Sequence, residues 1–126
     1  MRGDDIKTEA MFYYLSPESM VPQDHPLRPI RKMVDQALME LSPEFDKMYS
    51  RIGRPSVPPE KLLKGLLLQT LFSIRSVRQL MDQVGYNVLY KWFLGLAMDD
   101  KVWDHSTFSQ NQDRLIDTDI AKKFME

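Results

Sequence analysis

The sequence predicts an all-α protein, a small helical bundle that contains a helix-turn-helix-like unit. Apolar residues recur at steps of three and four in several stretches, and no stretch alternates apolar and polar residues between turn signals. Serine, asparagine, proline and glycine stand where helices usually begin and end. The 126 residues suffice for one domain. We place it at residues 21–117, after a lead-in of residues 1–20 and before the start of a linker helix at residues 118–126.

The first helix is expected over roughly residues 27–41, with Asp24 as its N-terminal cap. Ser42 followed by Pro43 is typical of a new helix start, so we expect a second, short helix that continues to about Tyr49. The apolar positions of the first helix are Leu27, Ile30, Val34, Ala37, Leu38 and Leu41.

The strongest helix signal follows Pro58, where leucines form a broad apolar face that ends near Phe72. This is the expected core helix. Ser76 and Gln79 then have the spacing of a capping box and predict another helix that ends near Val84. The buried face of that helix would be Val77, Leu80, Met81 and Val84.

Two further helices are expected downstream. Asn87 can cap one that ends near Gly95, and Ser106 or Thr107 can cap a last one that continues to about Ile116. Four aromatic residues in this part are expected to pack in the core rather than stack on bases: Trp92, Phe93, Trp103 and Phe108.

Composition excludes several classes of protein. The chain is 43% hydrophobic and 28% charged, as folded domains commonly are. Its longest apolar stretch, residues 62–72, is too short to cross a bilayer, and the N-terminus lacks the apolar segment of a signal peptide. We therefore expect a cytoplasmic protein. With no cysteine and two histidines, the chain is expected to need no metal or other cofactor.

Charge is unevenly distributed along the chain. The formal net charge is -1, yet residues 51–95 hold seven basic and two acidic residues, and each flank carries a net charge of -3. This segregation indicates an anionic partner for the middle of the chain.

Short helices joined by tight turns in a basic stretch are typical of helix-turn-helix proteins, although many small bundles share this pattern. If the helix from Ser76 is the one presented to DNA, its outward residues are Arg75, Arg78, Gln79, Asp82 and Gln83. Arginine can pair with guanine and glutamine with adenine through two hydrogen bonds. Two alternatives stay open: these residues form an ordinary solvated surface, or the helix after Asn87 is the reader and offers Tyr90 and Lys91.

Other basic residues are candidates for contacts with phosphate. Arg51 and Arg54 flank Gly53 in a loop that could grip the DNA backbone or enter a minor groove, or that could simply connect two helices. The complete set of candidate DNA-binding residues is Arg51, Arg54, Lys61, Lys64, Arg75, Arg78, Gln79, Gln83 and Lys91.

An acidic cluster with a histidine follows the basic stretch: Asp99, Asp100, Asp104 and His105. It raises the alternative of a small metal-dependent hydrolase, but metal catalysis needs carboxylates fixed by rigid elements. We favour a structural role, with Asp104 as an acceptor for the N-terminus of the last helix and His105 as a local hydrogen-bonding residue. No phosphate-binding loop or nucleophile motif is present, and no catalytic residue is assigned.

Several segments together resemble the N-terminal region of InsH-like transposases, the group that includes insertion sequence five. They occur in order over about residues 12–120 and are 21–28 (VPQDHPLR), 53–56 (GRPS), 67–69 (LLQ), 74–80 (IRSVRQL), 86–87 (YN), 92–96 (WFLGL) and 102–109 (VWDHSTFS).

The resemblance implies a helical domain that binds the terminal inverted repeats of a transposable element. It also implies a later ribonuclease-H-like domain whose Asp-Asp-Glu triad holds two metal ions. The sequence ends at Glu126, before that triad, so we expect no catalysis from this chain. The expected partner is double-stranded DNA, with neither a membrane nor a small-molecule substrate. The competing hypothesis is a protein-interaction module that forms a homodimer or docks on the catalytic domain through exposed apolar positions.

Overall fold

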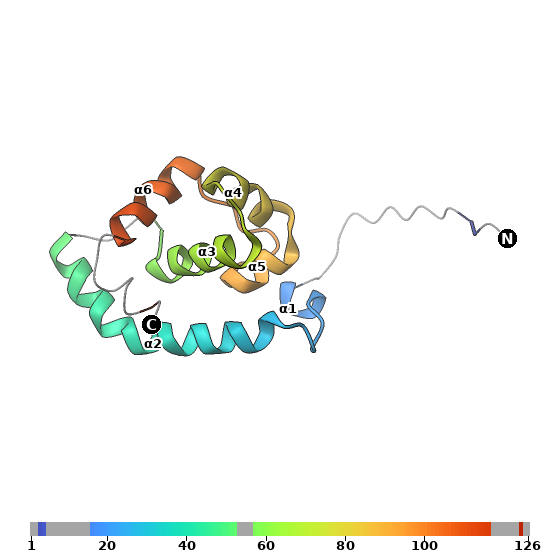
Figure 1. The fold of residues 1–126 in the computed structure, drawn as a ribbon, viewed down its shortest axis with the longest axis horizontal. Helices are drawn as coiled ribbons and strands as arrows, with labels where there is room; N and C mark the ends of the chain where they lie inside the picture. Colours follow the sequence, from blue (N-terminus) through green and yellow to red (C-terminus); the bar gives the residue numbers. More distant parts are fainter. Residues whose placement is uncertain (1–2, 5–15, 53–56, 117–123, 125–126) are drawn as a thin grey trace.

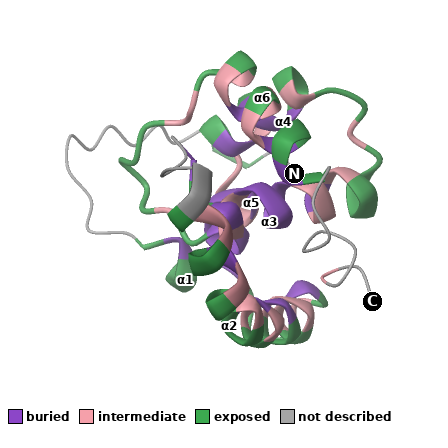
Figure 2. Ribbon diagram, turned by 90° about the vertical axis from the view of Figure 1, so that its left-hand side faces the viewer, coloured by how far each residue is buried: buried purple, intermediate pink, exposed green. Residues whose placement is uncertain are grey.

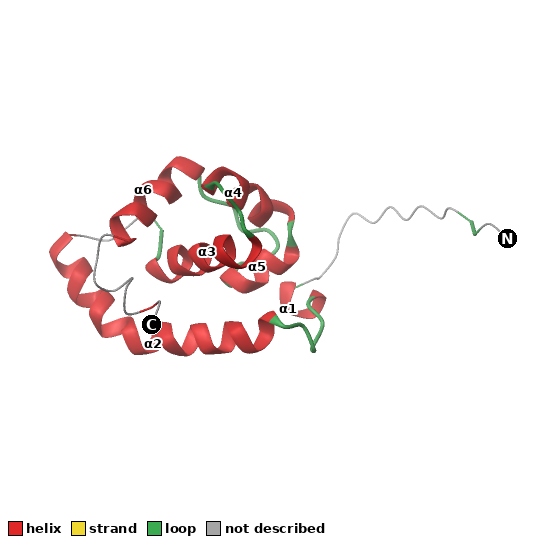
Figure 3. Cartoon of the chain, in the orientation of Figure 1, coloured by secondary structure: helices red, strands yellow, loops and turns green. Residues whose placement is uncertain are grey.

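The computed structural model describes residues 3–4, 16–52, 57–116 and 124, and in these residues it contains six helices and no strand (Figures 1 and 3). The predicted all-α class is therefore confirmed. The helices are α1 (Pro17–Met20), α2 (Leu27–Ile52), α3 (Pro59–Phe72), α4 (Val77–Tyr86), α5 (Val88–Leu94) and α6 (His105–Ile116). None of these described helices is long and apolar enough to span a bilayer. The predicted linker helix lies outside the described residues, apart from residue 124.

The structure has one continuous helix α2 where the sequence predicted two. Pro43 lies inside it, and a proline there cannot donate the backbone hydrogen bond to the carbonyl four residues earlier. Proline commonly bends a helix, and the axis of α2 turns between its cyan first part and its green last part (Figure 1). Leu38 and Phe45, on either side of Pro43, are only 5% and 3% exposed. Burial of these two side chains thus outweighs the local start signal.

The chain before α2 also differs from the expectation. His25, rather than Asp24, satisfies a free backbone N–H at the start of α2, because its Nδ1 accepts a hydrogen bond from Leu27 N at 3.1 Å. Within the expected lead-in, Ser16 caps the unpredicted helix α1 by accepting from Ser19 N at 3.3 Å. Helix α1 packs against α5, so the ordered bundle includes residues before 21.

Helix α3 lies in the middle of the fold and packs against α2, α4, α5 and α6. Its first turns are buried, with Leu62 and Leu63 each 1% exposed and Leu68 fully buried, and the buried colour concentrates on α3 and α5 (Figure 2). This confirms the predicted core helix. At its C-terminal end Leu71 and Phe72 are 46% and 42% exposed, so the apolar face is uncovered there.

The predicted caps of α4 and α5 are confirmed. Ser76 Oγ accepts from Gln79 N at 3.1 Å, and Asn87 Oδ1 accepts from Leu89 N at 3.0 Å. Gly95 ends α5 with φ of 77°, a left-handed conformation that glycine adopts without strain.

Helix α6 begins earlier than predicted. The expected cap was Ser106 or Thr107, but the Asp104 carboxylate accepts from the backbone N–H of both residues, at 3.0 and 3.3 Å. The structural role proposed for Asp104 is therefore confirmed. A carboxylate also suits the positive end of the helix dipole.

The four aromatic residues expected in the core do pack there. Phe93 and Phe108 are fully buried and Trp92 is 3% exposed. Trp103 is partly buried, and its ring centroid lies 5.8 Å from that of Phe108. The side chains of Trp92, Phe93 and Phe108 are therefore part of the core, and Trp103 packs against it.

Gly65 sets how closely α3 approaches α6. A Cβ atom built on it would lie 2.8 Å from Phe108 Cζ and 3.3 Å from Leu80 Cδ2, and the Phe108 ring is fully buried. We predict that Gly65→Ala lowers the free energy of unfolding by ~1–3 kcal/mol, although alanine is the better helix former.

Chemical denaturation of Gly65→Ala and of a control variant, Gly85→Ala, tests this prediction. Gly85 in α4 is the matched control, because an added Cβ there meets only Val102, at 3.8 Å. Gly85→Ala should leave stability unchanged or raise it by up to ~1 kcal/mol. Equal effects of the two substitutions would contradict the close approach at Gly65.

Candidate nucleic-acid interface

The turn between α3 and α4 fixes the direction in which α4 leaves the core. Ser73 has φ of 54°, and it is followed by Ile74, whose N–H donates to Gln69 O at 2.9 Å. Ser76 then caps α4, so only four residues separate the two helices. A short turn with a hydrogen bond at each end holds α4 at a fixed angle to α3.

Helix α4 buries one face and exposes the other. Leu80, Met81 and Val84 are buried and Val77 is half-buried, which confirms the predicted inward face. The opposite face carries the candidate residues: Arg75, Arg78 and Gln79 are exposed, as is Asp82, and Gln83 is half-buried. The structure thus gathers four of the nine predicted contact residues on one surface.

Tyr86 belongs to this surface and was missed in the sequence. It is 71% exposed, and its hydroxyl lies 3.5 Å from Gln83 Nε2. Its position seven residues after Gln79 places it on the same side of the helix, and that spacing was a signal that could have identified it.

A hollow of about 440 Å³ lies beside this face, at the turn between α3 and α4. Its wall includes the rings of Phe72 and Tyr90, whose centroids are 5.3 Å apart and whose planes are tilted by 32°. Burial raises the pKa of the Tyr90 hydroxyl. The hollow is lined by Phe72, Ser73, Ile74, Gln79, Asp82, Gln83, Tyr86 and Tyr90.

Arg78 is held by the first residue of α6. Its guanidinium lies 3.2 Å from His105 Nε2. Arginine has no acceptor, so His105 must accept this hydrogen bond through an unprotonated Nε2. His105 therefore orients Arg78 at the junction of α4 and α6, in agreement with its expected local role.

The three predicted lysines are buried or half-buried, and two of them have polar partners within the fold. Lys64 is 6% exposed, and its Nζ lies 2.6 Å from Asp35 Oδ1 on α2. Lys91 is 4% exposed. Lys61 is half-buried and donates to the carbonyl oxygen of Leu94 at the C-terminus of α5. From the sequence, these lysines were expected to contact the DNA backbone. A phosphate contact needs an accessible ammonium group, and the burial of Lys64 and Lys91 does not favour such a contact.

The position of Lys61 follows from the end of α5. A cation is stabilised by the negative end of a helix dipole, and Gly95 leaves room for it, since a Cβ there would lie 3.0 Å from Lys61 Nζ. Burial, followed by the charge of Lys64, lowers the pKa of Lys61. Lys61 therefore joins α3 to α5.

The alternative reader, α5, is also corrected by the structure. Tyr90 is 6% exposed and Lys91 4% exposed, so neither faces outward. With only seven residues, α5 packs against α1, α3 and α4, and these neighbours cover its sides. The predicted loop residue Arg54 lies outside the described residues, and of Arg51 only the backbone, in α2, is described.

The acidic cluster does not form a metal site. Asp104 caps α6, His105 contacts Arg78, and Asp100 Oδ2 accepts from Ala97 N at 2.7 Å. Asp99 is exposed in the loop between α5 and α6. Within the described part of the chain, no group of three or more His, Asp or Glu residues is placed to hold a metal ion.

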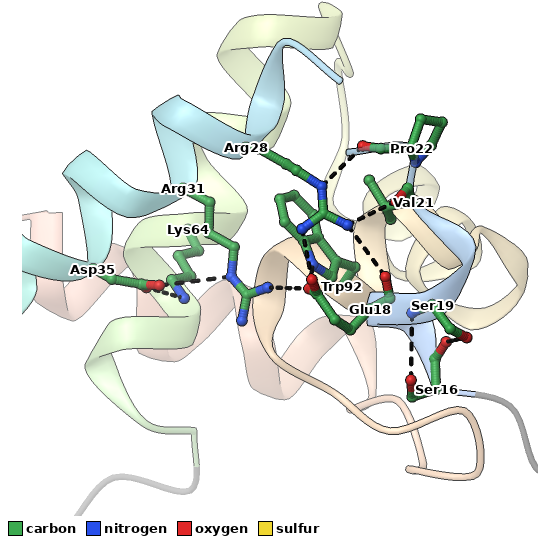
Figure 4. Close-up of polar contacts among 10 residues, drawn as sticks. All are labelled: Ser16, Glu18, Ser19, Val21, Pro22, Arg28, Arg31, Asp35, Lys64 and Trp92. Atoms are coloured by element: carbon green, nitrogen blue, oxygen red, sulfur yellow. Dashed lines mark hydrogen bonds and ion pairs between the residues drawn. The ribbon is translucent and has the colours of Figure 1, made fainter. Parts of the chain in front are cut away.

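A charged cluster that the sequence did not reveal joins α1, α2 and α5 (Figure 4). Glu18 accepts hydrogen bonds from Arg28 at 2.6 Å and from the Trp92 indole at 2.5 Å, and it lies 3.7 Å from Arg31. The guanidinium carbons of Arg28 and Arg31 lie 5.1 and 4.6 Å from the centre of the Trp92 ring. We call Glu18, Arg28, Arg31 and Trp92 the Glu18 cluster.

The Glu18 cluster continues to α3 through Asp35. This carboxylate lies 3.6 Å from Arg31 Nε and 2.6 Å from Lys64 Nζ. Arg28 also donates to the backbone oxygens of Val21 and Pro22, at 2.7 and 2.8 Å. The arginines of the Glu18 cluster therefore hold the fold together and are engaged with protein groups.

Comparison of the sequence with protein-family models identifies the family of the chain. The model described as Transposase domain (DUF772) matches residues 15–114. The chain belongs to the DUF772 transposase-domain family. Neither curated proteins nor solved structures gave a match.

The transposase-domain match begins one residue before Ser16, the cap of α1, and ends within α6. It therefore includes the Glu18 cluster as well as the exposed face of α4. Helix α1 and its contacts with Trp92 belong to the transposase domain and are no appendage to it.

We expect the Glu18 cluster to make the stability of the transposase domain depend on pH. Hydrogen bonds from Arg28 and then Trp92 lower the pKa of Glu18 below 4.5. A carboxyl group with a lower pKa in the folded state stabilises the fold above its unfolded pKa, and this stabilisation is lost as the pH falls through the folded value. We predict that acidification below about 4.5 releases α1 and changes the fluorescence of Trp92.

This prediction is best measured in Trp103→Phe, which leaves Trp92 as the single tryptophan. In that background, Glu18→Gln should have the acid-type emission already at pH 7 and lose the transition below pH ~4.5. The prediction fails if the variant and its parent titrate alike.

Proposed function

We propose that this transposase domain binds double-stranded DNA at the terminal inverted repeats of an insertion sequence, as the resemblance to InsH-like transposases implies. The exposed face of α4 would be the surface that reads the bases. The observation that carries this proposal is the division of α4 into a buried apolar face and an exposed face with Arg75, Arg78, Gln79 and Gln83.

The dimensions of α4 suit a major groove. Its ten residues correspond to about 15 Å of helix, and the groove of about 12 Å admits one α-helix. A helix-turn-helix interpretation is supported by the short turn after α3 and by the packing of α4 on both α3 and α6. In this arrangement α3 supports α4 from behind.

The exposed groups fall into two roles. Arg78 and Gln79 carry side chains that can make two hydrogen bonds with guanine and adenine, and Gln83 lies one turn further along. Asp82 between them would repel phosphate and favours the amino group of cytosine, so it supports recognition of bases. Arg75, in the turn, is suited to a phosphate. Arg51, whose backbone lies in the last turn of α2, and Arg54 remain candidates for phosphate contacts.

In this function the chain binds DNA and performs no chemistry, and it needs no cofactor of its own. Strand cleavage would belong to a ribonuclease-H-like domain of the kind that the resemblance implies, with its metal ions bound there. Self-association is a second candidate function, favoured by the exposed methionines of α2.

We predict that Arg78→Ala weakens binding to a terminal-repeat duplex by ~5- to 150-fold, because one bidentate contact contributes ~1–3 kcal/mol. Binding to a scrambled duplex should weaken much less. Fluorescence anisotropy across a salt series measures both affinities, and affinity should fall steeply as salt rises.

Lys47→Ala is the matched control for that experiment. Lys47 is exposed on α2, and its substitution also removes one positive charge. Equal losses for Arg78→Ala on the two duplexes would exclude Arg78 as a base-reading residue. Absence of binding at low salt would overturn the proposed function.

A further inference from the structure

The outer surface of α2 exposes two methionines. Met39 is 77% exposed and Met33 is 72% exposed, more than any other large apolar residue described. Figure 2 shows α2 nearly end-on, with exposed residues on the side that faces away from the other helices. A partner that covered both methionines would remove this apolar surface from water.

Charged residues flank the methionines in a symmetric order. Met33 and Met39 lie three residues before and after Gln36, and Lys32 and Glu40 lie four residues before and after it. All five are exposed. At 3.6 residues per turn, these positions form one face with Gln36 at its centre. The face therefore has opposite charges at equal distances from its middle.

We propose that this face binds the same face of a second copy of the chain, with the two α2 helices antiparallel about a two-fold axis at Gln36. The axis places Lys32 of each copy opposite Glu40 of the other, and Met33 opposite Met39. Each contact occurs twice, as in any isologous interface. A parallel pair would instead place Lys32 against Lys32 and Glu40 against Glu40, so the charges select the antiparallel arrangement.

The shape of the surface agrees with this occupant. An open hollow of about 570 Å³ is lined by Lys32, Asp35, Gln36, Met39 and Glu40. In the antiparallel pair, Met33 and Lys32 of the second copy lie over Met39 and Glu40, at this hollow. The carboxylate of Glu40 lies on the side of the hollow that the incoming Lys32 approaches.

The pairing leaves the DNA-binding candidate surface free. Helices α2 and α4 lie on opposite sides of α3 in both views (Figures 1 and 2). The inference rests on α2 alone and holds whether or not α4 binds DNA.

The contact is modest in area. It extends over about four turns, from Pro29 to Pro43, which is ~21 Å of helix. A standard interface buries ~800 Å² on each partner, and smaller ones are usually transient. We therefore expect a weak dimer with a dissociation constant in the micromolar range or higher.

Sedimentation equilibrium of the full chain, from about 1 µM to 500 µM, tests the proposal with charge-exchange variants. The wild-type mass should rise toward that of a dimer. Lys32→Glu and Glu40→Lys should each weaken self-association at least ~10-fold, because each opposes like charges twice. The double variant should associate as the wild type does, and an equimolar mixture of the two single variants should form a heterodimer.

A monomeric mass at every concentration would overturn the proposal, as would single variants that associate like the wild type. Within the part of the chain that the structure describes, Lys32 and Glu40 are exposed and form no ion pair that an exchange would break. Circular dichroism checks that each variant is folded. These outcomes are independent of DNA binding, which is measured on Arg78.

A cysteine cross-link tests the position of the axis. The chain has no cysteine, so Gln36→Cys introduces a single thiol that faces its own copy across the axis. This variant should oxidise to a disulfide dimer at least ~10-fold faster than Gln110→Cys, an exposed control on α6. Equal rates for the two variants would exclude an axis at Gln36.

Discussion

The close approach of α3 to α6 at Gly65 is the contact on which the rest of the arrangement depends. The Phe108 ring lies against the backbone of α3, where any side chain would displace it, and Leu80 of α4 meets the same point. Three helices are therefore fixed relative to one another by one residue without a side chain. The face that α4 turns inward is decided there, and with it the face that α4 exposes. The candidate DNA-binding surface is thus a consequence of core packing.

Basic residues in this protein either form contacts inside the fold or are available to a partner. The sequence alone does not show which residues belong to which group. The basic middle of the chain suggested an anionic partner, but Lys61, Lys64 and Lys91 point into the fold. Arg28 and Arg31, which were not singled out, bind Glu18 and the Trp92 ring. Net charge along the sequence therefore overstated the positive charge available on the surface.

The elements that could be predicted are those with a local physical cause. The caps at Ser76 and Asn87, the left-handed Gly95 and the buried stripe of α4 depend on neighbouring residues alone. The helix through Pro43 could not be predicted, because burial of Leu38 and Phe45 outweighs a local start signal. The contact between Glu18 and Trp92 joins residues 74 positions apart. Spacing rules apply only to residues close together in the sequence, so helix α1 and its packing against α5 were not predicted.

The ion pairs of Asp35 relate the proposed dimer surface on α2 to the proposed DNA-binding surface on α4. Lys64 and Arg31 both bind Asp35, which fixes the rotation of α2 about its own axis relative to α3. The rotation of α2 determines which of its residues face outward. In the same way, the close contact at Gly65 determines which residues of α4 face outward. With α2 and α4 on opposite sides of α3, a two-fold axis at Gln36 would leave one α4 exposed on each copy, the two facing apart. Two inverted repeats carry related sequences in opposite orientations, and two α4 helices related by a two-fold axis match that symmetry.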